Sequence, residues 1–314
     1  MNDLQKFVSK TAAWCVYAFL FCVAVRLIIL SVNIEQYPFK YLYQYQIDKI
    51  DKSSGIQTVF IGDSSLGNSI SAEEFSRLSR TNSMNAALTG YYGFAGQYNL
   101  LKRIIKKNLQ IKNVIVMNTL DMMGREISYQ GYLYSIGDIQ GLLELAPREK
   151  LSVIKALYTT RGDVIDDLLG LFKTRKDNER WKGDDYIKQQ DKKQFLTQAK
   201  GIPVSSIEKD KTLFLKKIII LCKTHGINLL YLHGPLWDSK VHASSSYITQ
   251  INGILKTTGI TLIDHVFAVP NAELGDSADH ITPPLKAEYT KKYYDLIRDH
   301  LIVPAPDNLE FSSY

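Results

Sequence analysis

Cysteine is scarce in this chain of 314 residues, which contains three. Cys15 and Cys22 lie in an apolar N-terminal segment, and Cys222 stands alone in the rest of the chain, where it can form no internal disulfide. There is no C-x-x-C pair and no Cys/His cluster, which argues against a structural zinc site. The sequence therefore predicts neither a metal nor a cofactor.

A strong excess of one charge is also missing. The formal net charge is +6, and Lys residues alternate with polar and acidic ones, as in IKKNLQIK and DKKQF. This pattern is typical of a solvated surface and does not indicate a nucleic-acid partner. Apolar residues make up 45% of the chain, enough for one membrane anchor and one sizeable α/β core, or at most two small domains.

One long apolar run is present at the N-terminus. Residues 11–32, TAAWCVYAFLFCVAVRLIILSV, carry a single charge, Arg26. A membrane-spanning helix needs about 20 apolar residues, whereas the core of a cleavable signal peptide has about 7–15. The alternative is a signal peptide, but no A-x-A cleavage site follows the run. Lys6 and Lys10 precede it, so we expect a cytoplasmic N-terminus and a periplasmic or extracellular domain.

The predicted organisation follows from this anchor. Residues 1–32 form the cytoplasmic tip and transmembrane anchor, and 33–55 form a tether. Residues 56–304 form an α/β domain, interrupted at about 122–205 by an insertion or cap rich in Gly, Tyr, Asp and Lys. Residues 305–314 form a polar tail.

Strand and helix patterns alternate within the domain. Strands are expected in 57–62, 81–90, 114–121, 227–235 and 260–266, and helices in 71–80, 97–109, 212–226, 247–259 and 285–302. Ser71 and Glu74 have the spacing of a capping box. The alternation predicts a three-layer α/β/α domain with a parallel, flavodoxin-like sheet. A site should lie at the carboxyl ends of its strands.

The stretch VFIGDSS places Ser64 just after the first expected strand. A serine hydroxyl needs a nearby base and donors for an oxyanion to act as a nucleophile. Among the six histidines, His280 alone has neighbouring carboxylates suited to orient an imidazole, Asp276 and Asp279. His225 and His300 are expected to face solvent. Taken alone, without His280 and its neighbouring carboxylates, the stretch GDSS could equally be an ordinary polar turn.

Three segments together resemble the SGNH/GDSL hydrolases. IGDSS resembles the block that carries the nucleophile, here Ser64. MNAALTGYYG resembles the second block, whose glycine supplies an oxyanion N–H, here Gly90 beside the N–H of Ser64. GDSADHIT before a helix resembles the block whose Asp and His complete the triad, here Asp276 and His280. The resemblance covers residues 56–121 and 212–300.

Two departures from that family's pattern matter. The third block usually ends in Gly-x-Asn-Asp, and its Asn donates to the oxyanion, but this chain has MNTLD with Leu120 at that position. Asn118 is a candidate substitute. The triad Asp usually lies three residues before the His. Asp276 lies four before His280 and is favoured, and the adjacent Asp279 is the alternative.

The departures and the anchor make the chain similar to membrane-tethered SGNH-like proteins of envelope-polymer modification, such as DltD-type and alginate-acetylation proteins. That resemblance implies O-acyl transfer to a cell-envelope or exported polysaccharide, beside a multi-spanning membrane acyltransferase as partner. A carbohydrate or lipid esterase with the same triad is one alternative. A catalytically inactive SGNH-like scaffold or glycan-binding protein is the other.

Overall fold

The computed structural model of this protein contains two compact units. It describes residues 3–31, 38–107, 110–125, 128–136, 143, 147–159, 199–207 and 212–303. One unit comprises Met1–Tyr45 and Ile127–Asn178, and the other comprises Gln46–Glu126 and Glu179–Tyr314. A large part of the expected insertion therefore groups with the N-terminal segment and not with the sheet. The expected tail, and residues 160–198 of the insertion, lie outside the described residues.

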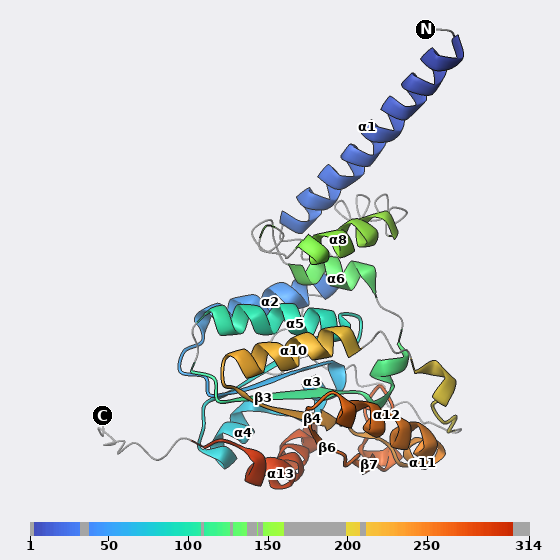
Figure 1. The fold of residues 1–314 in the computed structure, drawn as a ribbon. Helices are drawn as coiled ribbons and strands as arrows, with labels where there is room; N and C mark the ends of the chain where they lie inside the picture. The colour runs from blue at the N-terminus through green and yellow to red at the C-terminus, as the bar shows by residue number, and fades with distance from the viewer. Residues whose placement is uncertain are drawn as a thin grey trace. The chain divides into compact units, whose positions relative to one another are not determined.

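The larger unit is built on a five-stranded sheet in which every neighbouring pair of strands is parallel (Figure 1). Its strands are β1 (Thr58–Gly62), β2 (Ser83–Ala87), β3 (Asn113–Asn118), β4 (Asn228–His233) and β6 (Thr261–Ile263), in the order β2-β1-β3-β4-β6. Counted within this sheet, the order is 2-1-3-4-5, as in flavodoxin-like sheets. The predicted α/β class and parallel sheet are confirmed.

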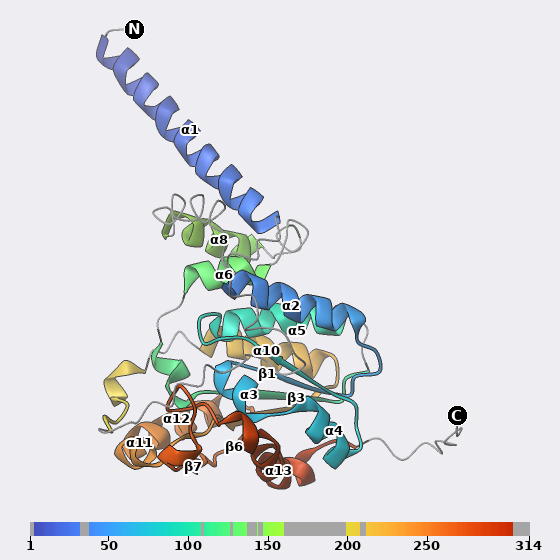
Figure 2. The same cartoon turned by 180° about the vertical axis from the view of Figure 1, so that it is seen from behind.

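Helices cover both faces of this sheet (Figures 1 and 2). The helices α5 (Gly93–Lys106) and α10 (Thr212–Thr224) pack together on one face. On the other face lie α4 (Ala72–Ser79), α12 (Ser245–Thr257) and α13 (Lys286–Ile297). The remaining elements are short: α3 (Ser64–Ser69), α11 (Asp238–Ala243), the paired strands β5 (Leu236–Trp237) and β7 (Ala268–Val269), and the 3₁₀ turns η1 (Leu120–Gly124), η3 (Val204–Ser206), η5 (Asn271–Glu273), η6 (Pro283–Leu285) and η7 (Arg298–His300).

The central strands are made mostly of residues that are apolar or small enough to be buried on both sides. Every residue of β1, β2 and β3 is buried, as expected for a parallel sheet covered by helices. At the end of β1, a side chain on Gly62 would lie 1.8 Å from the carbonyl oxygen of Met117. Glycine at this position lets β1 lie close to β3 where the site begins.

The predicted capping box is present at the start of α4. Ser71 is the N-cap, and its Oγ accepts a hydrogen bond from Glu74 N at 3.3 Å. Gly226 has a φ of 64° just after α10, as predicted for a helix ending there. Local signals therefore fixed these helix ends correctly.

Most of the segment predicted to be a tether, residues 33–55, is a helix. Helix α2 spans Pro38–Lys52, and it buries Leu42, Ile47 and Ile50. Within the larger unit, Gln46 Nε2 donates to Ala87 O at 2.7 Å, so the helix is bonded to the end of β2. Its apolar positions recur at helical spacing, but the intervening Tyr, Gln and Lys residues gave the segment the composition of a linker.

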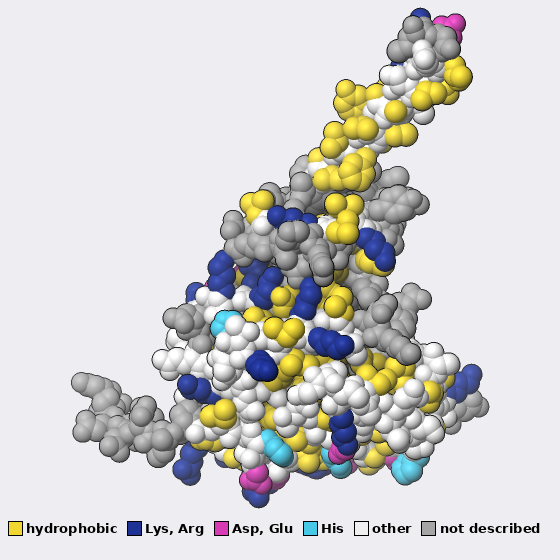
Figure 3. Space-filling view, in the orientation of Figure 1, with side chains coloured by type: hydrophobic (Ala, Val, Ile, Leu, Met, Phe, Trp, Pro, Cys, Tyr) yellow, Lys and Arg dark blue, Asp and Glu magenta, His cyan; other side chains and the backbone are white. Residues whose placement is uncertain are grey.

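The smaller unit contains α1 (Asp3–Ser31), α6 (Tyr129–Ile136) and α8 (Pro147–Thr159). Helices α6 and α8 pack against each other. Apolar side chains are exposed along α1 (Figure 3). By length and composition, the segment Asp3–Val25 of this helix could cross a membrane. A signal sequence near the N-terminus would meet the same criteria. The side chain of Arg26 lies outside the described residues.

Candidate active site

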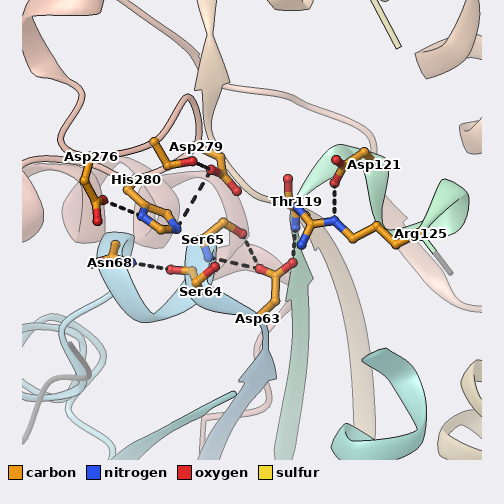
Figure 4. Close-up of polar contacts among 11 residues, drawn as sticks. Asp63, Ser64, Ser65, Asn68, Thr119, Asp121, Arg125, Asp276, Asp279 and His280 are labelled. Carbon is orange, nitrogen blue, oxygen red and sulfur yellow. Dashed lines mark hydrogen bonds and ion pairs between the residues drawn. The ribbon is translucent and has the colours of Figure 1, made fainter. Parts of the chain in front are cut away.

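The predicted nucleophile lies where β1 passes into α3. Asp63 caps this helix: its Oδ1 accepts hydrogen bonds from Ser65 N at 3.0 Å and from Ser65 Oγ at 2.7 Å. Its Oδ2 accepts a hydrogen bond from Thr119 N, just after β3, at 2.9 Å. The turn is thus fixed to two strands. Half-buried Ser64 lies at the carboxyl edge of the sheet (Figure 4).

Asp63 is fully buried, and its pKa is raised to about 6. Burial is the largest cause, and the charge of Asp279 adds to it. The hydrogen bonds from Ser65 and Thr119, and the charge of Arg125, lower the pKa but do not offset burial. Figure 4 shows Asp279 and Arg125 around the same turn.

The predicted base is carried by a tight loop after η5. An antiparallel bridge joins Leu274 to Ile281 and closes the loop. Trp237 N donates to Ala278 O at 2.7 Å, which ties the loop to β5. Backbone contacts therefore fix the position of His280, independently of its side-chain partners.

The imidazole of His280 lies between two carboxylates. Its Nδ1 lies 2.8 Å from Asp276 Oδ1, a hydrogen-bonding distance. Its Nε2 lies 3.9 Å from Asp279 Oδ1, and the Asp279 carboxylate also accepts a hydrogen bond from Ser277 Oγ. Asp276 therefore occupies the position of an orienting acid, although it lies four residues before the histidine.

The charges around His280 raise its pKa above the ordinary value of 6.5. Burial has the largest single effect and by itself would lower this pKa. The hydrogen bond to Asp276, and the negative charges of Asp279, Asp276 and Asp63, together outweigh burial. At neutral pH the imidazolium is therefore more populated than for a free histidine.

Helix α13 docks the histidine loop against α3. Lys286 Nζ donates to Gly67 O at 2.6 Å, and Ser71 N donates to Thr290 Oγ1 at 2.9 Å. Figure 4 shows His280 beside Ser64, with its Nε2 edge on the serine side. Among the described residues, no hydrogen bond joins Ser64 Oγ to His280. Such bonds are often long in unliganded active sites and shorten when substrate binds.

Two backbone donors lie where the sequence predicts an oxyanion site. Within the described part of the chain, the N–H groups of Ser64 and Gly90 have no hydrogen-bond partner. Gly90 follows β2, the strand next to β1, and Leu88 N donates to Gly62 O at 2.9 Å to fix this loop beside the nucleophile turn. Both donors are therefore free to bind an external acceptor.

Asn118 is oriented differently from its predicted role. It is fully buried, and its Oδ1 accepts a hydrogen bond from Gln97 Nε2 at 2.6 Å. Its Nδ2 donates to Gln97 Oε1 at 3.2 Å. This reciprocal pairing gives no support to Asn118 as an oxyanion donor. Leu120, where the resemblance to SGNH hydrolases leads us to expect an Asn, is also buried.

The other histidines do not join the site. His225 and His300 are exposed, as predicted, and so are His242 and His265. His233, at the end of β4, is buried and its Nε2 lies 2.7 Å from Asn252 Oδ1. Burial lowers the pKa of His233 to about 4, so it is a neutral core residue.

Several residues of the site were not found from the sequence. Thr119 N holds Asp63, and Asn68 Nδ2 donates to Ser64 O at 2.7 Å. Arg125 Nε donates to Asp121 Oδ1 at 2.8 Å beside the site. Only the i,i+4 spacing of Asp121 and Arg125 offered a signal, and that spacing is common on solvated surfaces.

No set of three or more His, Cys, Asp or Glu side chains in the described residues is placed to hold a metal ion. The groups that the described residues bring to the site are a hydroxyl group, an imidazole with a carboxylate, backbone donors and the Arg125 guanidinium. Comparison with protein-family models and with curated proteins gives no match to this chain.

Proposed function

We propose that the larger unit is an SGNH-type serine O-acyltransferase that works through an acyl-serine intermediate on Ser64. One observation carries the proposal: the His280–Asp276 pair, with its 2.8 Å contact, is docked by α13 against the short helix that begins at Ser64. A serine, a histidine and an orienting acid are recognised by such geometry whatever their order in the chain.

The mechanism follows from these groups. With Nδ1–H donating to Asp276, Nε2 of His280 is free to take the proton of Ser64 Oγ, which attacks the acyl carbonyl. The oxyanion binds to the N–H groups of Ser64 and Gly90. His280 then protonates the leaving group. The acceptor hydroxyl gives its proton to Nε2 as it attacks the acyl-serine, and His280 passes that proton to Ser64 Oγ as the bond between Oγ and the acyl group breaks.

The place of this reaction is inferred from α1. A helix long and apolar enough to span a membrane, preceded by Lys6 and Lys10, supports a single-pass protein with an extracytoplasmic catalytic domain. An acyl donor on that side requires export of the acyl group, which supports a multi-spanning membrane acyltransferase as partner. A cell-envelope or exported polysaccharide is the proposed acceptor.

The full chain in detergent should be labelled by a serine-reactive fluorophosphonate. We expect labelling and p-nitrophenyl acetate turnover to fall about 10³-fold or more in Ser64→Ala and His280→Asn. Exposed Ser246→Ala and His300→Asn are matched controls and should keep wild-type rates. Equal labelling of wild type and Ser64→Ala would refute the proposal. It would then favour a scaffold or glycan-binding protein.

The acceptor separates the two enzymatic alternatives. Turnover that releases acetate, without transfer to any glycan hydroxyl in the assay, would favour the esterase. Transfer to an oligosaccharide, dependent on Ser64, is the outcome expected for the acyltransferase.

A further inference from the structure

The site lacks one donor that a complete serine oxyanion hole of this type would have. Leu120 has no donor, and both polar ends of the Asn118 amide are engaged by Gln97. Among the described residues at the site, the backbone N–H groups of Ser64 and Gly90 remain without a partner. Loss of one oxyanion donor typically reduces kcat about 10²–10³-fold, so another group at this position would matter.

Arg125 occupies the space beside Gly90. A Cβ built on Gly90 would lie 2.0 Å from Arg125 Nη1, closer than any real Cβ contact. Gly90 does not have a positive φ, unlike Gly55, Gly93 and Gly226. Its backbone would therefore accept alanine, and the added methyl group would force the end of the Arg125 side chain to move away from this position.

The guanidinium is held by one edge and has free donors on the other. Nε donates to Asp121 Oδ1, and within the described residues neither Nη1 nor Nη2 has a hydrogen-bond partner. Figure 4 shows the Arg125 guanidinium beside Thr119 and Asp63, at the turn that carries Ser64. A planar group anchored through Nε keeps its remaining N–H groups in fixed directions.

We infer that Arg125 donates the third hydrogen bond to the oxyanion formed at Ser64, beside the N–H groups of Ser64 and Gly90. This inference rests on the proposed acyl-transfer function. When Ser64 Oγ bonds to the carbonyl carbon, the π pair moves onto the carbonyl oxygen, which accepts the hydrogen bond from an Nη–H. No bond to Arg125 forms, and the pair returns when the leaving group departs with the proton from His280.

The test compares Arg125→Ala with Arg77→Ala in the full chain. Arg77 is the matched control, because it is an exposed arginine that is also paired with a carboxylate, Glu74, at 2.6 Å. With the neutral ester p-nitrophenyl acetate, we expect kcat to fall about 10²-fold or more in Arg125→Ala, with KM nearly unchanged, and Arg77→Ala to match wild type. Guanidinium ion at tens of millimolar should restore kcat at least about tenfold in Arg125→Ala alone.

Three results would overturn the inference: a kcat loss in Arg125→Ala within about threefold of Arg77→Ala, a loss confined to KM, or a loss that guanidinium does not rescue. The first would make Arg125 structural, and the second would make it a ground-state binding group. Failure of the proposed function is distinct, because wild type and Ser64→Ala would then turn over alike before any Arg125 variant is compared.

A second measurement uses Gly90 itself. Gly90→Ala should displace the guanidinium, so its kcat loss should be much smaller in an Arg125→Ala background than in wild type. Losses that multiply independently would mean that Arg125 does not act through the contact with Gly90.

Discussion

The two carboxylates beside His280 have different positions and should have different effects. Both raise the pKa of the imidazole, but only Asp276 contacts Nδ1. A base must be neutral to accept the serine proton, so a raised pKa shifts the acid limb of the pH–rate profile above about 6.5. Activity should therefore rise with pH through the pKa of His280.

Asp276→Asn should move that limb to lower pH, because it removes a negative charge and a charged hydrogen bond. It should also lower kcat by up to about 10⁴-fold, the loss found when a triad acid becomes an amide. Asp279→Asn is the matched variant: we expect a shift of the limb in the same direction, with a much smaller loss of kcat. Profiles of kcat/KM against pH measure both effects.

If Asp279→Asn instead caused the larger loss of kcat, Asp279 would be the orienting acid, and the contact at Nδ1 would not be the productive one. Comparison of these two variants thus decides which of the two carboxylates orients His280, a choice that the sequence left open.

At the scale of elements, the close contact between β1 and β3 at Gly62 is a sensitive point of the scaffold. Gly62→Ala would place a methyl group against Met117 O, which is backbone and cannot move without shifting β3. We expect a loss of about 1–3 kcal/mol of unfolding free energy, read as a lower Tm of the full chain.

Gly253→Ala is the control for that prediction. Gly253 lies in α12, and an added Cβ there would meet no atom within 4 Å. Alanine is the better helix former, so this variant should gain about 0.4–1 kcal/mol. If both variants changed Tm by the same amount, the close contact of Gly62 with Met117 O would not determine the stability of the fold.

Much of the larger unit could be predicted from sequence, because its strands are continuous apolar runs and its helices are amphipathic. Ser71 and Gly226 marked helix ends through local chemistry alone. The two-residue strands β5 and β7 were missed, since two residues show no periodicity. Helix α2 was not predicted because its polar residues are typical of a linker. One of them, Gln46, is buried by its hydrogen bond to Ala87 O, a contact that the sequence does not reveal.

The candidate site was only partly predictable for the same reason. Ser64, Gly90 and His280 lie in short motifs with characteristic neighbours. The pairing of Asn118 with Gln97, and the approach of Arg125 to Gly90, depend on contacts between distant segments. Such contacts are set by the packing of whole elements, which no local pattern specifies.

At the scale of the whole molecule, α1 should anchor the chain. The full chain should remain in the membrane fraction after an alkaline carbonate wash, because a helix of this length and apolarity partitions into lipid. A variant lacking Asp3–Ser31 should move to the soluble fraction. Intact mass of the membrane-bound protein should include Met1 or Asn2. A mature N-terminus after the apolar run would show instead that the segment is a cleaved signal peptide.

The docking of α13 on α3 has a consequence for the order of events during synthesis. Lys286 and Gly67, which it joins, are 219 residues apart in the chain. Ribosomes add about 5–20 residues each second, so the hydroxyl group emerges many seconds before the imidazole that would activate it. On the proposed mechanism, a nascent chain would therefore have no acyl-transfer activity until α13 packs against α3. A truncated product that lacks this part of the chain would have the serine but no base to activate it.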